Sequence, residues 1–361
     1  MFVAWRDLRF AKGRFTLMGT VVVLITLLVG LLSGLTAGLA RENISAITGL
    51  PADRLAFAAP PAGRSVSFTN STVTESQWQR WAERPGVTRA QPLGIRTLNG
   101  AAGDRTAAVS AFGTEPSGDL APESAKLGPG RVVLSASAAE ELGVGVGGAV
   151  RLGPLEATVA AVAGDASYSH TPVVWTSLDD WQKLGHNGTT PEEQATVVAL
   201  DVTDEAGLGV GDAALGTESR TIDEALTAIG SYQAENGSLQ LMRGFLFAIS
   251  ALVIGAFFTV WTIQRSGDVA VLKALGASTP YLLKDALGQA VLMLAAGTLL
   301  GTTLAVGAGV LISGGDVPFV LEPLTVLGPA AVITVLGVLG AALSIRRITA
   351  VDPLTALGSA R

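Results

Sequence analysis

Side chains able to do chemistry are scarce in this chain of 361 residues, which contains two histidines and no cysteine. Without cysteine, neither a disulfide framework nor a thiolate metal site is possible. His170 lies two residues after Tyr168, and both residue types ligate iron, although a solvated loop histidine is the commoner situation. His186 stands in the run GHNG, which is typical of a turn. The pair Arg41-Glu42 is the third candidate, because it directly follows a long uncharged run.

Motifs that would make the chain an enzyme by itself are absent from the sequence. It contains no Gly-x-x-x-x-Gly-Lys-Ser/Thr run, so no loop of this type cradles the phosphates of ATP. It contains no His-Glu-x-x-His run, and we find no recognisable pairing of a nucleophile with a base. We therefore expect a protein that is not an enzyme, with no catalytic residues and no intrinsic cofactor.

The elements that position these residues are dominated by four stretches without any charged residue. Each is long enough to cross a bilayer core, which takes about 20 residues in a helix. They are Phe15–Ala40, Gly244–Gln264, Ala286–Gly315 and Pro323–Ile345. A composition of 49% apolar and only 15% charged residues also favours a membrane protein. No ionisable residue stands in the middle of a stretch, which argues against a proton- or ion-coupled carrier.

The distribution of lysine and arginine predicts the orientation in the membrane. These residues flank the first stretch on its N-terminal side, fill the loop between the second and third stretches, and recur in the tail. The segment Arg41–Arg243 instead has 14 Lys/Arg against 24 Asp/Glu, a net charge of −10. By the positive-inside rule, both termini are cytoplasmic and this segment is outside. We expect a multi-pass protein of the cytoplasmic (inner) membrane, in contact with lipid and not with nucleic acid.

The fold class expected is a membrane protein of four transmembrane helices with a large α+β extracellular domain between helices 1 and 2. The domain is expected to contain strands at Gly130–Leu134, Pro172–Trp175 and Val197–Val202, a hairpin within Ala149–Val162, and helices at Ser135–Leu142 and Ser177–Leu184. The predicted boundaries are a cytoplasmic amphipathic helix at 1–14, TM1 at 15–40, the α+β domain at 41–220, a stalk helix at 221–243, TM2 at 244–264, a cytoplasmic loop at 265–285, TM3 at 286–315, a short outer loop at 316–322, TM4 at 323–345 and a cytoplasmic tail at 346–361.

Two local features refine these boundaries. The helix over Thr221–Arg243 is expected to be interrupted near Asn236-Gly237, because both residues favour turns. Gly30, Gly34 and Gly38 recur every four residues, so they form one face of small residues that allows close helix packing.

Two cytoplasmic segments carry recognisable sequence. Residues 264–278 read QRSGDVAVLKALGAS, and residues 346–357 read RRITAVDPLTAL. Both resemble the permease subunits of the FtsX/MacB-like (type VII) class of ABC transporters, as does the layout of one span, an outer domain and three spans. Where that class more often has glutamate, this chain has Asp268, which keeps the charge.

This resemblance implies a homodimer of the permease with two copies of a separate ABC ATPase, which binds the ATP. It also implies mechanotransmission, in which stalk helices carry the motion of the ATPase to the outer domain. The loop is expected to be an amphipathic coupling helix that docks on the ATPase, rather than a helix packed on the membrane. Its expected contact residues are Asp268, Leu272, Lys273, Leu275, Gly276 and Ala277.

Within this class, the start of the chain and its length resemble the haem-efflux permeases, which implies haem as the cargo. Ferric iron accepts carboxylate oxygen, so Glu42 is the expected iron ligand, and Arg41 is expected to meet a propionate. The alternative for these two residues is that they only mark the membrane boundary. The alternatives for the protein are an exporter of antibiotic, peptide or lipid-linked cargo, and a non-transporting regulator.

Overall fold

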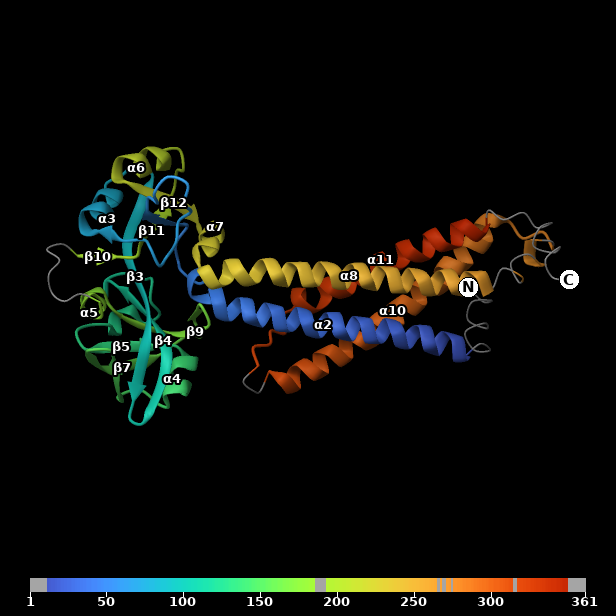
Figure 1. The fold of residues 1–361 in the computed structure, drawn as a ribbon, viewed down its shortest axis with the longest axis horizontal. Helices are drawn as coiled ribbons and strands as arrows, with labels where there is room; N and C mark the ends of the chain where they lie inside the picture. Colours follow the sequence, from blue (N-terminus) through green and yellow to red (C-terminus); the bar gives the residue numbers. More distant parts are fainter. Residues whose placement is uncertain are drawn as a thin grey trace. The chain divides into compact units, whose positions relative to one another are not determined.

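The computed structural model describes residues 12–185, 193–264, 267, 271–273, 275–313 and 317–349. It divides into two compact units, each described here by itself (Figure 1). We call Met1–Gly38 with Ser238–Arg361 the helical unit, and Leu39–Gly237 the inserted domain. Most of the predicted helix at 1–14 lies outside the described residues, as do His186 and the tail beyond residue 349.

Four helices that are long and apolar enough to cross a membrane confirm the predicted spans. They are α2 (Lys12–Thr48), α8 (Gly230–Gln264), α10 (Thr279–Ile312) and α11 (Pro323–Thr349) (Figure 1). The helix α2 has 37 residues and α8 has 35, whereas about 20 suffice to cross the hydrocarbon core. Both helices therefore extend beyond the uncharged runs on which the prediction was based, and α2 includes Arg41 and Glu42.

The glycine face of α2 packs tightly within the helical unit, as its spacing predicts. A Cβ atom added to Gly30 would lie 2.9 Å from the Cβ of Ala305 in α10. A Cβ added to Gly34 would lie 2.2 Å from Cζ of Phe319, and one added to Gly38 would lie 2.2 Å from a backbone oxygen of the same loop. The amide of Val320 also donates to the carbonyl of Gly34 at 3.1 Å. The small face of α2 thus receives one helix and the loop before α11.

The predicted stalk helix begins later than expected and has no interruption. Thr221 caps the short helix α7 (Ile222–Ala225) in a capping box with Glu224, and the 3₁₀ turn Leu226–Ala228 follows. The chain is extended at Ile229, and α8 then begins at Gly230. It runs through Asn236-Gly237 without a break, so the turn preference of this pair is overridden.

The inserted domain is built on a ten-stranded mixed sheet with the order β12-β1-β11-β3-β4-β9-β5-β7-β6, in which β8 pairs with β9. The strands of this sheet are β1 Arg54–Ala58, β3 Val87–Ala102, β4 Arg105–Thr114, β5 Arg131–Leu134, β6 Ala149–Leu152, β7 Leu155–Val162, β8 Ser167–Tyr168, β9 Thr171–Ser177, β11 Val197–Val202 and β12 Thr217–Thr221. The pairs β4–β9 and β5–β7 are parallel, and the others are antiparallel. A separate two-stranded sheet joins β2 (Val73–Thr74) to β10 (Gln194–Ala195).

Short helices cover this sheet, and the predicted α+β composition is confirmed. They are α3 Glu75–Ala82, α4 Ala136–Leu142, α5 Leu178–Lys183, α6 Leu208–Leu215 and α7, with a 3₁₀ turn at Ser124–Lys126. The hydroxyl of Ser135 caps α4 and that of Ser177 caps α5, as serine N-caps predict. The strands expected near 130–134, 149–162, 172–175 and 197–202 are all present.

The hydrophobic core of the inserted domain extends to the ends of both long helices. Phe57, Phe112 and Trp175 are buried at its centre, with Phe112 and Trp175 in edge-to-face contact. Ile47 from the last turn of α2 and Ile229 directly before α8 are buried in the same cluster. Burying an isoleucine contributes about 1.5–3 kcal/mol, so each contact anchors its segment in the domain.

Candidate functional site

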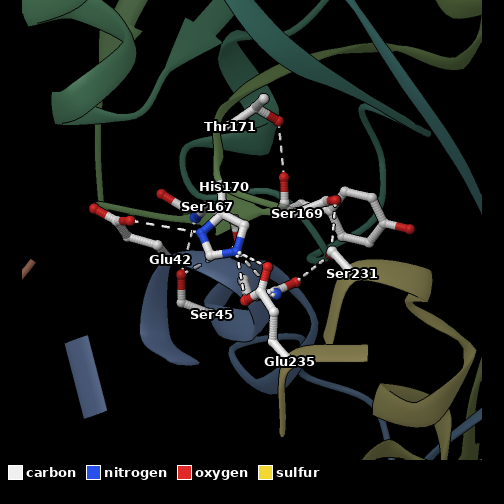
Figure 2. Close-up of polar contacts among 10 residues, drawn as sticks. Glu42, Ser45, Ser167, Ser169, His170, Thr171, Ser231 and Glu235 are labelled. Carbon is white, nitrogen blue, oxygen red and sulfur yellow. Dashed lines mark hydrogen bonds and ion pairs between the residues drawn. The ribbon is translucent and has the colours of Figure 1, made fainter. Parts of the chain in front are cut away.

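A cluster of polar side chains in the inserted domain joins three segments that are far apart in sequence (Figure 2). Glu42 and Asn43 come from α2, His170 from the turn between β8 and β9, and Ser231 and Glu235 from α8. We call these five residues the polar cluster. Two sequence candidates, Glu42 and His170, are therefore neighbours, although their positions in the chain gave no sign of it.

The turn that carries His170 has an unusual backbone conformation. Tyr168 pairs with Thr171, so Ser169 and His170 form a two-residue hairpin turn. Their φ angles are 51° and 61°, and positive φ at both central positions is the signature of a type I′ turn. Such turns favour Asn-Gly, because residues with a Cβ resist this conformation. We call Ser169-His170 the hairpin turn.

Hydrogen bonds from α2 hold the hairpin turn in place. The amide of Ser169 donates to the carbonyl of Asn43 at 2.9 Å, and the amide of His170 donates to the carbonyl of Glu42 at 3.2 Å. Both exposed amides of the turn are thus satisfied by the helix backbone. A strained conformation persists where its surroundings determine it, and here the determining element is α2.

The imidazole of His170 lies between two carboxylates. Its Nε2 is 2.9 Å from Oε2 of Glu235, and its Nδ1 is 3.7 Å from Oε2 of Glu42 (Figure 2). The contact with Glu235 is a hydrogen bond, whereas the contact with Glu42 is longer than one. Glu42 has a side chain that is 44% exposed, so its carboxylate remains open to a further partner.

Asn43 fixes the buried side of the cluster. It is almost fully buried in α2, its Nδ2 donates to Oε2 of Glu235 at 3.3 Å, and its Oδ1 accepts from the hydroxyl of Ser231 at 2.8 Å. The hydroxyls of Ser231 and Ser169 are 2.9 Å apart. One buried amide therefore links α2, α8 and the hairpin turn, and its removal would leave partly buried polar partners without a hydrogen bond.

The surroundings of Glu42 are acidic. Burial raises the pKa of the nearby Glu141 carboxyl, and the charges of Glu42 and Glu140 raise it further. Arg41 is exposed to solvent. In the described part of the chain, no group of three His, Cys, Asp or Glu residues is placed to enclose a metal ion. The cluster thus offers one accessible carboxylate with an adjacent imidazole, which suits a ligand that needs one or two protein donors.

The second candidate site is the loop after α8, where Val271–Lys273 is helical and ends in a glycine turn. Gly276 has a φ of 94°, its amide donates to the carbonyl of Lys273, and the amide of Ala277 donates to the carbonyl of Leu272. This pair of bonds is a Schellman motif, in which glycine closes a helix at no steric cost. We call Val271–Ala277 the coupling turn. Asp268 lies outside the described residues.

The coupling turn exposes apolar side chains. Leu275 is 79% exposed, Val271 is 53% exposed and Leu272 is 40% exposed. A contiguous set of exposed aliphatic residues on a short helix is typical of an interaction surface or of contact with lipid. The Schellman motif presents Leu275 directly before the glycine that ends the helix.

Asn43, Ser231 and Glu235 carry no motif in the sequence, and only the fold brings them to His170. Their positions follow from the continuation of α2 past Ala40 and from the start of α8 at Gly230. The available signal was the apolar pair Ile44 and Ile47, which continues a helical pattern beyond the charged residues.

Comparisons with known proteins match almost the whole chain. Residues 15–208 match the family model of the MacB-like periplasmic core domain, and residues 241–353 match that of the FtsX-like permease C-terminal domain. The first of these models covers more than half of the chain.

Curated relatives are similar over their full length. The chain is 27% identical to a protein named putative hemin transport system permease protein HrtB from Staphylococcus haemolyticus, over 99% of both chains. It is 24% identical to an uncharacterized ABC transporter permease of Mycobacterium tuberculosis, again over 99% of both chains. Among solved structures, the periplasmic region of MacB from Actinobacillus actinomycetemcomitans matches with a TM-score of 0.35 and 14% identity, over 49% of this chain and 92% of that one.

Proposed function

This chain belongs to the family of FtsX-like permeases with a MacB-like periplasmic core domain, and from that premise we propose that it is the permease subunit of an ATP-driven efflux pump. The chain lacks a phosphate-binding loop of the Walker type, so a separate ABC ATPase hydrolyses the ATP. Two copies of the permease assemble with two copies of that ATPase.

The coupling turn is the docking site for the ATPase. Its exposed residues Val271, Leu272 and Leu275 provide the apolar face, and Lys273 adds charge. Asp268, four residues before Leu272 in the sequence, is proposed as a further charged contact. A helix that places aliphatic side chains in a partner's groove is a recurrent mode of recognition. The excess of lysine and arginine in this loop supports a cytoplasmic location for it, together with both termini.

Mechanotransmission is supported by the lengths of α2 and α8. Each helix exceeds the length required to cross the membrane by about 15 residues, and each ends or begins in the core of the inserted domain. A helix transmits displacement along its axis because its backbone is internally hydrogen-bonded. The absence of ionisable residues from the middle of the uncharged runs supports an energy source other than an ion gradient.

The cargo proposed is haem, taken from the membrane and ejected outward. Full-length similarity to a protein named as a hemin transport permease carries this proposal. The exposed carboxylate of Glu42 ligates the ferric iron, with Arg41 on the propionates. A carboxylate is a weaker ligand than the thiolate or histidine of permanent haem proteins, which suits a site that must also release its cargo.

Haem titration of the full-length permease in nanodiscs tests the cargo and the site together. Haem is expected to give a saturable shift of its Soret band, and Glu42→Ala is expected to weaken binding at least tenfold. Glu83→Ala, which removes an exposed carboxylate from the end of α3, is the matched control and is expected to bind as the wild type does.

Two other outcomes would change the assignment. Unchanged binding by Glu42→Ala would exclude Glu42 as the ligand. No saturable Soret shift with any variant would exclude haem, and would favour another lipophilic cargo or a non-transporting regulator of the same family.

A further inference from the structure

The inserted domain contains a cavity that is separate from the polar cluster in its lining and chemistry. Its volume is about 400 Å³, within the range of small-molecule sites. Phe68, Ile95 and Tyr168 form apolar parts of its wall, and Arg96 and Trp181 complete it. All five belong to the inserted domain, so the cavity is internal to one unit.

Trp181 packs directly on the sheet, in the space left by two glycines that have no side chain. Gly94 of β3 and Gly113 of β4 are directly paired across the two strands. A Cβ added to Gly94 would lie 2.4 Å from Cδ2 of Trp181, and one added to Gly113 would lie 2.3 Å from Cβ of Trp181. Only glycine at both positions lets the indole lie this close to the sheet, so the position of Trp181 is fixed by the strands.

Arg96 extends over the indole of Trp181, with its Cζ 5.2 Å from the ring centroid. In contrast, Arg54 pairs with Glu205, and Arg89 pairs with Asp119. Among the residues that the structure describes, no carboxylate forms an ion pair with Arg96. The guanidinium therefore lines the cavity as a cation oriented by an aromatic ring, in a segment of net charge −10.

Hydroxyl and amide side chains, several of them already hydrogen-bonded, make up much of the remaining wall, and Tyr168 adds a free donor to it. Tyr168 is 7% exposed, and its hydroxyl makes no hydrogen bond with a described residue; burial raises its pKa, so it remains a neutral donor. The indole Nε1 of Trp181 has no described partner, but it is fully buried and does not face the cavity, so Trp181 contributes its ring rather than a donor. The hydroxyl of Ser71 is already used, since it accepts from Ala58 N and donates to the carbonyl of Thr196.

We propose that this cavity binds a small anion with a planar apolar body, most simply an aromatic carboxylate. Arg96 provides a planar pair of donors that matches a carboxylate, and the hydroxyl of Tyr168 offers a further donor in the same wall. Phe68 and Ile95 contact the apolar part of the ligand. The site is independent of the proposed haem efflux, because it uses neither Glu42 nor Arg41.

Isothermal titration calorimetry of the full-length chain in nanodiscs, with naphthoate as the probe, tests this proposal. We expect saturable binding of naphthoate, and at least tenfold weaker binding of the neutral analogue naphthalenemethanol. Arg96→Gln is expected to reduce the affinity for naphthoate at least tenfold while leaving the affinity for naphthalenemethanol unchanged. Tyr168→Phe, which keeps the ring, is expected to reduce it about threefold to tenfold.

Arg64→Gln is the matched control, since Arg64 is exposed in the same domain and does not line the cavity. It is expected to bind naphthoate as the wild type does. Absence of saturable naphthoate binding, equal binding of the acid and the alcohol, or equal binding by wild type and Arg96→Gln would overturn the proposal. The Soret shift of Arg96→Gln with haem is expected to match the wild type, which separates this site from the efflux function.

Discussion

The coupling turn and the hairpin turn both place the backbone in the positive-φ region, and they differ in how the sequence permits it. The coupling turn uses Gly276, for which a φ of 94° has no steric cost, and the apolar side chains around it are exposed. The hairpin turn uses Ser169 and His170, which have side chains, and holds them by hydrogen bonds to α2. The first turn is locally determined, and the second is determined by its tertiary contacts.

This difference indicates what each turn can do. A locally determined turn with exposed leucines keeps its conformation whether or not a partner is bound. A turn that depends on α2 and touches α8 responds when either helix moves. Under the proposed function, the hairpin turn would transmit helix movement to the cargo at Glu42, and the coupling turn would receive the force of the ATPase.

The largest effect is expected at the exposed leucine of the coupling turn. Leu275→Asp would place a charge in the proposed contact with the ATPase and lose the burial of a leucine, which is worth about 1.5–3 kcal/mol. ATP hydrolysis by the reconstituted complex is expected to lose its dependence on cargo, with at least tenfold weaker association of the two subunits. Steady-state ATPase assays and pull-down of the ATPase measure these two effects.

Val210→Asp is the control for this prediction, because Val210 is an exposed valine in α6 of the inserted domain. It adds the same charge outside the coupling turn and is expected to leave the ATPase unaffected. A Leu275→Asp complex with normal association and normal cargo-dependent activity would show that docking occurs elsewhere.

A smaller effect is expected from the conformational strain of the hairpin turn. His170→Gly and His170→Ala both remove the imidazole, but only glycine accepts a φ of 61° freely. We expect the glycine variant to be more stable by about 1 kcal/mol, equivalent to a Tm difference of about 2–4 °C in a domain of this size. Thermal unfolding of the full-length protein in detergent measures the difference.

Which of the two variants, His170→Gly or His170→Ala, is the more stable shows whether the backbone of His170 is strained. At an ordinary backbone position glycine is less stable than alanine by about 0.5–1 kcal/mol. A glycine variant less stable than the alanine variant would therefore contradict the strained conformation of His170.

Much of the architecture could be predicted from the sequence, because its signals are local. Four uncharged runs predicted the spans, the patterns at Ser135–Leu142 and Ser177–Leu184 predicted α4 and α5, and the run KALGA contains the glycine of the coupling turn. The polar cluster could not be predicted in the same way. Its partners Asn43, His170 and Glu235 are joined only by the pairing of β8 with β9 and by the lengths of α2 and α8.

The first turns of α8 show that a local signal can also predict an interruption that the structure does not contain. Asn236-Gly237 favours a turn, yet these residues are helical, because the helix continues on both sides of them. The cavity at Arg96 was likewise not evident in the sequence. It depends on the cross-strand pairing of Gly94 with Gly113, which makes room for Trp181.

The smallest effect is expected from pH at the carboxylates near the hairpin turn. The pKa of Glu141 is raised in the folded protein above its ordinary value of 4.5, first by burial and then by Glu42 and Glu140. The folded state therefore binds more protons than the unfolded state in the interval above this value, and Glu141 lowers stability as pH rises through that interval. Glu141→Gln is expected to stabilise the folded state slightly at pH 7, by less than about 0.5 kcal/mol, because the side chain is only partly buried and solvent screens its charge.

Unfolding measured across pH checks this prediction. The advantage of Glu141→Gln is expected to shrink as pH falls through the raised pKa and to disappear when the carboxyl is protonated in both states. An advantage that is constant across the range would contradict the electrostatic explanation.

Haem-dependent ATP hydrolysis by the permease reconstituted in nanodiscs with its ABC ATPase tests the central claim most directly. We expect the permease to be inactive by itself, and the complex to hydrolyse ATP faster when haem is added, with the increase lost in both Leu275→Asp and Glu42→Ala. Hydrolysis by the permease without an ATPase, or a rate that haem does not change, would contradict the proposal that a cytoplasmic motor drives haem efflux through this chain.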